Sequence, residues 1–168
     1  MDMLDFEGES LYFDEALGDE AQQCIDQAAN NYAEAGSEEP LMRAYFLEPE
    51  HPMVLVAMYR YFYYQHRIAD ALIVAERVLR IYAKKLEFPE DWNDLNEEYL
   101  EKHRKDSMTL VRFYLLALKG AAYLELRLGK EESAVSRLKK ILELDSNDRL
   151  GAKVLLDVAV YKDLKSVS

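Results

Sequence analysis

The chain has 168 residues, of which 50% are hydrophobic, with six glycines, four prolines and a net charge of −11. This length fits one domain with its own core, and the low glycine and proline content excludes a mostly disordered chain. No block of lysine and arginine is present, which argues against nucleic-acid binding, and the single cysteine, Cys24, excludes an intramolecular disulfide. Charged residues interrupt every apolar stretch, so no membrane span or signal peptide is predicted, and a cytoplasmic protein is expected.

The negative charge belongs to the N-terminal quarter. Residues 1–42 contain twelve acidic residues and no lysine or arginine, whereas the remainder holds 20 acidic and 21 basic residues. Residues 1–18 mix acids with large apolar side chains, a composition typical of segments that become ordered on a surface. We therefore expect an acidic-hydrophobic arm at 1–18, followed by a single domain at 19–168. The arm either forms a frayed terminus or edge helix, or docks onto a surface of this chain or of a second subunit.

Apolar residues recur with helical spacing from Gly18 onward, and no strand-like alternation of useful length appears. The sequence thus predicts an all-α protein. The predicted helices cover residues 20–35, 39–48, 52–65, 68–84, 91–104, 108–128, 131–144 and 149–164. Residues suited to capping or beginning a helix stand at several of these boundaries, namely Asp19, Ser107, Asp148, Pro40, Pro52 and Pro89.

An internal repeat is the strongest pattern in the chain. Three sets of residues share the successive steps 3, 1, 3 and 4, and a small or apolar residue follows five positions after each set. The sets are Ile25/Ala28/Ala29/Tyr32/Gly36, Leu55/Met58/Tyr59/Phe62/His66 and Leu118/Ala121/Ala122/Glu125/Gly129, followed by Leu41, Ala71 and Ala134. Each set describes a helix whose inner stripe packs against a second helix after a turn. The turn positions are therefore residues 36, 66 and 129.

This pattern resembles the tetratricopeptide repeat (TPR), most closely in Tyr-Tyr-Gln-His-Arg-Ile-Ala-Asp-Ala-Leu at 63–72 and Leu-Gly-Lys-Glu-Glu-Ser-Ala at 128–134. The sequence departs from the TPR pattern at several positions: His66 replaces the turn glycine, Glu125 replaces an inner aromatic residue, and Ser146 stands where proline is usual. In addition, Glu48-Pro49 ends the second helix of the first repeat early. The resemblance implies a right-handed solenoid of helical hairpins with an inserted helix and a C-terminal capping helix. The implied units are hairpins at about 20–49, 52–84 and 108–145, an insertion at 85–107 and a cap at 149–165.

The TPR resemblance also implies a concave groove, lined by the first helix of each repeat, that binds a peptide or helix of a partner. Aromatic and cationic side chains predominate at the matching positions, and such residues dominate peptide-binding energetics. The candidate groove residues are Val56, Arg60, Tyr63, Tyr64, Lys119, Tyr123 and Arg127. In the alternative interpretation, these tyrosines pack against the inserted helix. The Lys and Asn pattern that grips the C-terminal carboxylate of heat-shock chaperones is incomplete here.

No motif predicts catalysis, a metal site or a cofactor. The histidines His51, His66 and His103 are far apart and lack metal-ligand spacing, and no phosphate-binding loop appears. A small-ligand-binding helical bundle remains an alternative of a different class, and it requires His66 and His103 to converge in one cavity. The helix at 108–128 is apolar on nearly all sides, so it forms either the centre of the core or a homodimer interface.

We therefore predict a protein-interaction module, an adaptor or chaperone, whose partner is a peptide or helix of acidic-hydrophobic character. Two more specific interpretations remain open. Small acidic TPR proteins serve as chaperones in type III secretion, although the insertion weakens that parallel. In addition, residues 59–67 and 107–119 are similar to short TPR proteins associated with bacterial nitrogen-fixation gene clusters, which suggests an accessory or assembly factor for a metalloenzyme such as nitrogenase.

Overall fold

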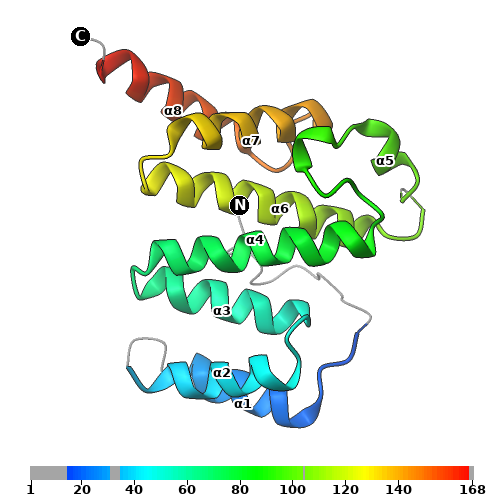
Figure 1. Cartoon of the computed structure of the whole chain (residues 1–168), viewed down its shortest axis with the longest axis vertical. Helices are drawn as coiled ribbons and strands as arrows, with labels where there is room; N and C mark the ends of the chain where they lie inside the picture. Colours follow the sequence, from blue (N-terminus) through cyan, green and yellow to red (C-terminus); the bar gives the residue numbers. More distant parts are fainter. Residues whose placement is uncertain (1–14, 31–34, 104, 167–168) are drawn as a thin grey trace.

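The computed structural model describes residues 15–30, 35–103 and 105–166, and all regular elements in these ranges are helical (Figure 1). This confirms the predicted all-α class. The α-helices in the described part of the chain are α1 (Asp19–Ala29), α2 (Glu38–Leu47), α3 (Pro52–Tyr64), α4 (Ile68–Lys85), α5 (Glu97–Glu101), α6 (Met108–Arg127), α7 (Glu131–Leu144) and α8 (Ala152–Ser166). The described residues also include short 3₁₀ turns at Ala35–Ser37 and Trp92–Asp94.

The helices pack in chain order as successive hairpins. Extensive contacts join α1 to α2, α3 to α4 and α6 to α7, and α4 packs against α6 across the insertion. Figure 1 shows these helices as rows that run from α1 and α2 at one end of the molecule to α8 at the other. This arrangement matches a helical repeat, while the right-handed solenoid twist stays a prediction.

Two of the predicted turn positions adopt the backbone conformation that a repeat turn requires. His66 and Gly129 both have left-handed φ, at 57° and 76°. After each of them the next amide donates back to a carbonyl of the last helical turn, from Arg67 N to Phe62 O at 2.9 Å and from Lys130 N to Glu125 O at 2.8 Å. Both helices thus end in the same six-to-one hydrogen-bonded motif. The shared motif explains why glycine is usual at this position and why His66 stands out.

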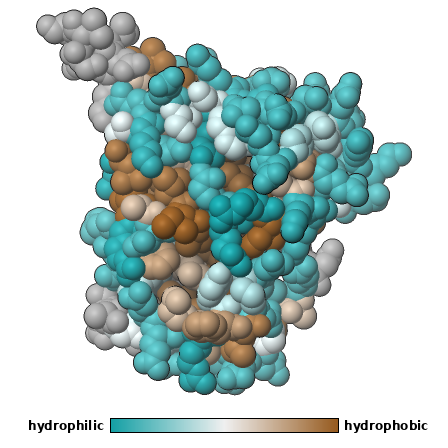
Figure 2. All heavy atoms as spheres, viewed as in Figure 1, coloured by the Kyte–Doolittle hydropathy of each residue, from teal (hydrophilic) through white to brown (hydrophobic). Residues whose placement is uncertain are grey.

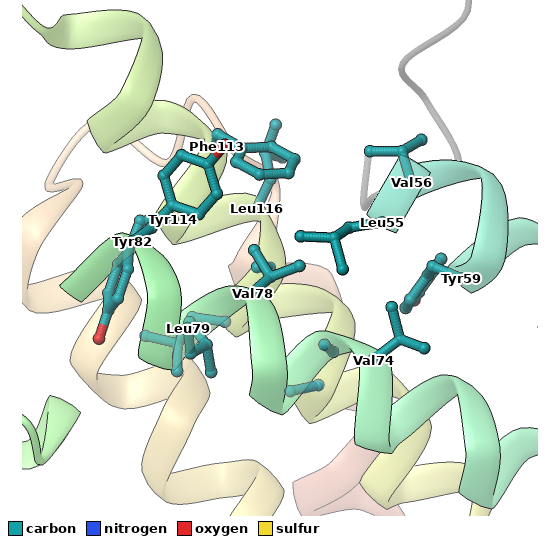
Figure 3. Packing of buried hydrophobic residues seen from close by; sticks show 14 of the residues in the cluster. Leu55, Val56, Tyr59, Val74, Val78, Leu79, Tyr82, Phe113, Tyr114 and Leu116 are labelled. Atoms are coloured by element: carbon teal, nitrogen blue, oxygen red, sulfur yellow. The ribbon is translucent and has the colours of Figure 1, made fainter. Parts of the chain in front are cut away.

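The core is centred on α6, which packs against α4, α7 and α8. Figure 3 shows its junction with α4, where the rings of Tyr82 and Phe113 meet edge to face at a centroid distance of 4.8 Å. Phe113, Leu118 and Leu124 are fully buried. The all-round apolar character of this helix therefore reflects its central place in the core, because other helices of the same chain cover its sides.

The single helix predicted at 91–104 is wrong. The insertion forms only the 3₁₀ turn Trp92–Asp94 and the short helix α5. Side chains compete with the helical backbone here: Asp91 Oδ1 accepts from Asn93 N at 2.9 Å, and Asn96 Oδ1 accepts from Glu98 N at 3.0 Å. Leu95 between them is fully buried. The two side-chain caps and the burial of Leu95 therefore set the conformation of this segment, which does not form one continuous helix.

Other predicted boundaries shift by a few residues. α1 ends at Ala29, and residues 31–34 of the helix predicted at 20–35 lie outside the described residues. α8 begins at Ala152 rather than 149, because Asp148 and Gly151 have left-handed φ of 49° and 69°. Asp148 still caps that helix, since its Oδ1 accepts from Ala152 N at 2.7 Å. Residues 1–14 of the predicted arm also lie outside the described part of the chain.

Candidate functional site

Three predicted groove residues from two different hairpins meet at the C-terminal ends of α3 and α6. The hydroxyl oxygens of Tyr63 and Tyr123 lie 3.3 Å apart, and Arg127 Nη1 donates to Tyr123 Oη at 3.2 Å. The Arg127 guanidinium also lies 6.0 Å from the centroid of the Tyr123 ring. The hydrogen bond to Tyr123 raises the pKa of Arg127, whose side chain is exposed. We call Tyr63, Tyr64, Tyr123 and Arg127 the aromatic–arginine cluster.

The remaining members of the predicted groove on α3 differ in exposure. The Tyr64 side chain is 56% exposed and its ring meets Tyr63 edge to face at 5.5 Å. Arg60, one turn earlier on α3, is half-buried. Tyr99 and His103 of the insertion instead pack against Phe88, which follows the end of α4 and also belongs to the insertion.

Val56 and Lys119 are not surface residues of the groove. Val56 is 4% exposed and belongs to the buried core cluster (Figure 3). Lys119 is 3% exposed, and its Nζ donates to the carbonyl oxygen of Leu150 at 2.7 Å. Both positions match the repeat pattern, but both side chains are buried. A buried ammonium that is hydrogen-bonded to a carbonyl secures the start of α8 against α6, so Lys119 has a structural contact there.

A hollow of about 430 Å³ adjoins the cluster. Tyr123 belongs to the cluster and also lines this hollow. Most of the other lining residues lie at or just before the start of α8. Its lining consists of Lys119, Tyr123, Asp148, Arg149, Leu150, Gly151, Val154 and Leu155. A larger hollow of about 740 Å³ lies near the beginning of α6 and is lined partly by α5 and the loop between α7 and α8. The smaller hollow, next to the cluster, is partly apolar, because Val154 and Leu155 form part of its wall.

Apolar side chains are also exposed elsewhere on the molecule. Figure 2 shows hydrophobic residues gathered on the left of that view at the level of α4 and α6, whereas hydrophilic residues cover most of α7 and the insertion. Exposed apolar residues include Phe46 on α2, Ile73 on α4 and Val158 on α8. The aromatic–arginine cluster differs from these single residues because hydrogen bonds join its members across two hairpins.

A buried ion-pair network is the feature that the sequence analysis missed. Arg137 on α7 donates from Nε to Glu125 Oε2 at 3.1 Å and from Nη2 to Glu125 Oε1 at 3.0 Å, and it also pairs with Glu76. Ser133 donates to Glu125 at 2.9 Å, and the Trp92 ring lies 5.2 Å from the guanidinium. The departure at Glu125 was the only sequence signal, because its partners lie on other elements.

The three histidines do not form a site. His51 Nε2 donates to the carbonyl of Glu15 at 2.9 Å, His103 Nε2 donates to that of Leu86 at 2.7 Å, and His66 is exposed at its turn. None of them lines either hollow described above. Within residues 15–30, 35–103 and 105–166, no group of three or more His, Cys, Asp or Glu side chains is placed to hold a metal ion. No helix in these ranges is both long and apolar enough to span a membrane.

Comparison with known proteins gives one informative relative. No protein-family model matches the chain, and no solved structure matches it, so the TPR resemblance depends on the repeat pattern and the helical arrangement. The relative is described as "Uncharacterized 19.8 kDa protein in nifW 5'region" of Azotobacter chroococcum mcd 1. It is 44% identical over 158 residues, which cover 94% of this chain and 88% of that protein. The chain therefore belongs to the family of that nifW-region protein.

Proposed function

We propose that this protein is an interaction module of nitrogen fixation, an adaptor or chaperone without catalytic activity, that binds a peptide or helix of a partner protein. The observation that carries the proposal is the aromatic–arginine cluster. Tyr63 and Tyr123, sixty residues apart in sequence, are joined by hydrogen bonding beside an exposed arginine. Tyrosine and arginine are the residue types most enriched at binding hot spots.

The cluster and the neighbouring hollow suit a partner segment with apolar and acidic side chains. The tyrosine rings and the wall formed by Val154 and Leu155 supply apolar contact area. Two arginines supply positive charge: Arg127 in the cluster and Arg149 in the lining of the hollow. A carboxylate of the partner would accept hydrogen bonds from a guanidinium, and the pairing would steer association and fix its register.

The family relationship supports a role in nitrogen fixation. The relative is named for its position in the 5' region of nifW, a nitrogen-fixation gene. This location favours an accessory or assembly factor for a nitrogen-fixation enzyme such as nitrogenase over a secretion chaperone. The partner is then a protein produced with the same gene cluster.

Affinity capture from nitrogen-fixing cells, followed by calorimetry with each purified candidate, tests the proposal. The variants are Arg127→Glu with Tyr123→Ala, and Arg80→Glu as a control with the same charge change on an exposed residue of α4. We expect one nitrogen-fixation protein to bind the wild type and the control alike, and the cluster variant at least about thirtyfold more weakly, as hot-spot substitutions do. Equal binding to both variants would exclude the cluster as the site.

A further inference from the structure

The two helices that carry the cluster are positively charged in an acidic protein. α3 and α6 together contain Arg60, Arg112, Lys119 and Arg127 but one carboxylate, Glu125. Glu125 is buried and accepts two hydrogen bonds from Arg137 and one from Ser133. It therefore contributes no negative charge to the surface beside Arg127. Lys119 is buried as well, so the exposed or half-buried charges of these two helices are those of Arg60, Arg112 and Arg127.

Residues 1–14, which lie outside the described residues, have the complementary composition. They contain five acidic residues and no lysine or arginine. Seven large apolar residues stand among these acids, namely Met1, Met3, Leu4, Phe6, Leu11, Tyr12 and Phe13. This is the acidic and apolar chemistry that the cluster suits.

The structure fixes the point from which this segment starts. The carbonyl of Glu15 accepts from His51 Nε2 at 2.9 Å, and its carboxylate pairs with Lys85 Nζ at 3.1 Å. Glu15 is thereby held at the N-terminal end of α3 and the C-terminal end of α4. The thirteen residues of α3 span about 20 Å, whereas fourteen extended residues reach about 46 Å. The segment is therefore long enough to reach Tyr63 and Tyr64 at the other end of α3.

We propose that residues 1–14 bind in cis to the aromatic–arginine cluster and occupy it until a partner of the same chemistry displaces them. A short tether gives such a segment a local concentration in the millimolar range, so even weak intrinsic affinity suffices for occupancy. The displacement step rests on the proposed function, whereas the cis contact does not. A partner must therefore bind the cluster with enough affinity to displace the segment, so acidic ligands of low affinity are excluded.

The test uses the full chain and a labelled synthetic peptide of residues 1–14 as the probe. In one variant, Asp5→Asn, Glu7→Gln and Glu9→Gln remove charge from the segment without changing its length. We expect the peptide to bind this variant about tenfold more tightly than the wild type, because the cis segment no longer competes. Equal affinity for the two chains would overturn the proposal.

Two further substitutions in the charge-depleted chain locate the binding surface. Arg127→Glu should weaken peptide binding at least about tenfold, whereas Arg80→Glu on α4 should leave it within about twofold, because only Arg127 belongs to the cluster. Circular dichroism checks that each variant is folded. Equal effects of the two substitutions would overturn the proposal. If the peptide binds but affinity capture finds no partner, the proposed function is refuted and the cis contact stands. If a partner binds at the cluster but the peptide does not, the cis contact is refuted and the proposed function stands.

Discussion

Arg137 and Glu125, twelve residues apart on α7 and α6, form a two-point hydrogen-bonded ion pair that is almost completely buried. Their side chains are 7% and 5% exposed. The pair joins the two helices of the third hairpin in its interior. The ring of Trp92, a residue of the insertion, packs over the guanidinium. A second contact from α7 to the insertion is the hydrogen bond from Lys140 Nζ to the carbonyl of Leu95, at 2.9 Å. α7 therefore holds the insertion through two side chains one turn apart.

Removing one member of the buried pair should destabilise the protein strongly. Arg137→Met leaves the Glu125 carboxylate buried without its partner, and we expect the free energy of unfolding to fall by about 3–5 kcal/mol. Adding Glu125→Leu should restore most of that loss, because an apolar pair has no desolvation penalty to offset. Urea unfolding followed by circular dichroism measures both. If the double variant were no more stable than Arg137→Met, the buried charge would not be the cause.

Gly120 lies inside α6 because the hydroxyl of Tyr59 approaches it. A Cβ atom at position 120 would lie 3.0 Å from Tyr59 Oη and 3.5 Å from Cζ. We expect Gly120→Ala to lower the free energy of unfolding by about 1 kcal/mol, since overpacking outweighs the gain in helix propensity. In a Tyr59→Phe background the same substitution should cost less, because the nearest atom is gone. A double-mutant cycle measures the difference, and identical effects in both backgrounds would rule out the contact.

The two left-handed turn residues predict opposite effects of substitution. At His66, with φ of 57°, glycine removes the strain on Cβ, and His66→Gly should stabilise the chain by about 0.5–1 kcal/mol. At Gly129, with φ of 76°, Gly129→Ala introduces that strain and should destabilise it by about 1–2 kcal/mol. Thermal unfolding reports both shifts. A loss of stability in His66→Gly would mean that the imidazole makes a contact worth more than the strain.

Alkaline pH should weaken the fold through its buried tyrosines. Burial raises the pKa of Tyr114 from 10.0 to about 12, and burial also raises the pKa of Tyr82. Between pH 10 and pH 12 the Tyr114 hydroxyl is ionised in the unfolded chain but still protonated in the folded chain. This tyrosine therefore does not lower the free energy of unfolding below pH 10, and it lowers it progressively as the pH rises toward 12. For Tyr114 alone the loss amounts to about 2–3 kcal/mol.

Urea midpoints measured across this pH range test the effect of alkaline pH, with Tyr114→Phe as the matched variant. Its stability should decline less with pH, because one of the buried hydroxyls that resist ionisation is absent. Parallel curves for the variant and the wild type would show that Tyr114 does not contribute.

Much of the helical architecture follows from local sequence. Apolar spacing predicts α3, α4, α6 and α7 to within a residue or two, because these helices bury one or more continuous faces. The repeat pattern also locates the turns at His66 and Gly129. The insertion was mispredicted because Asp91 and Asn96 form short-range hydrogen bonds that a periodicity argument does not weigh.

The sequence by itself determined the helical class, the turns at His66 and Gly129, and the aromatic-cationic character of α3 and α6. Only the tertiary structure decided which groove residues form a surface. Tyr63, Tyr123 and Arg127 meet at one edge, whereas Val56 and Lys119 are buried. Helical spacing gives the direction of a side chain from its own helix but not what covers it. Burial and the ion pair of Glu125 with Arg137 depend on how separate helices pack, so they emerge only when the chain is folded.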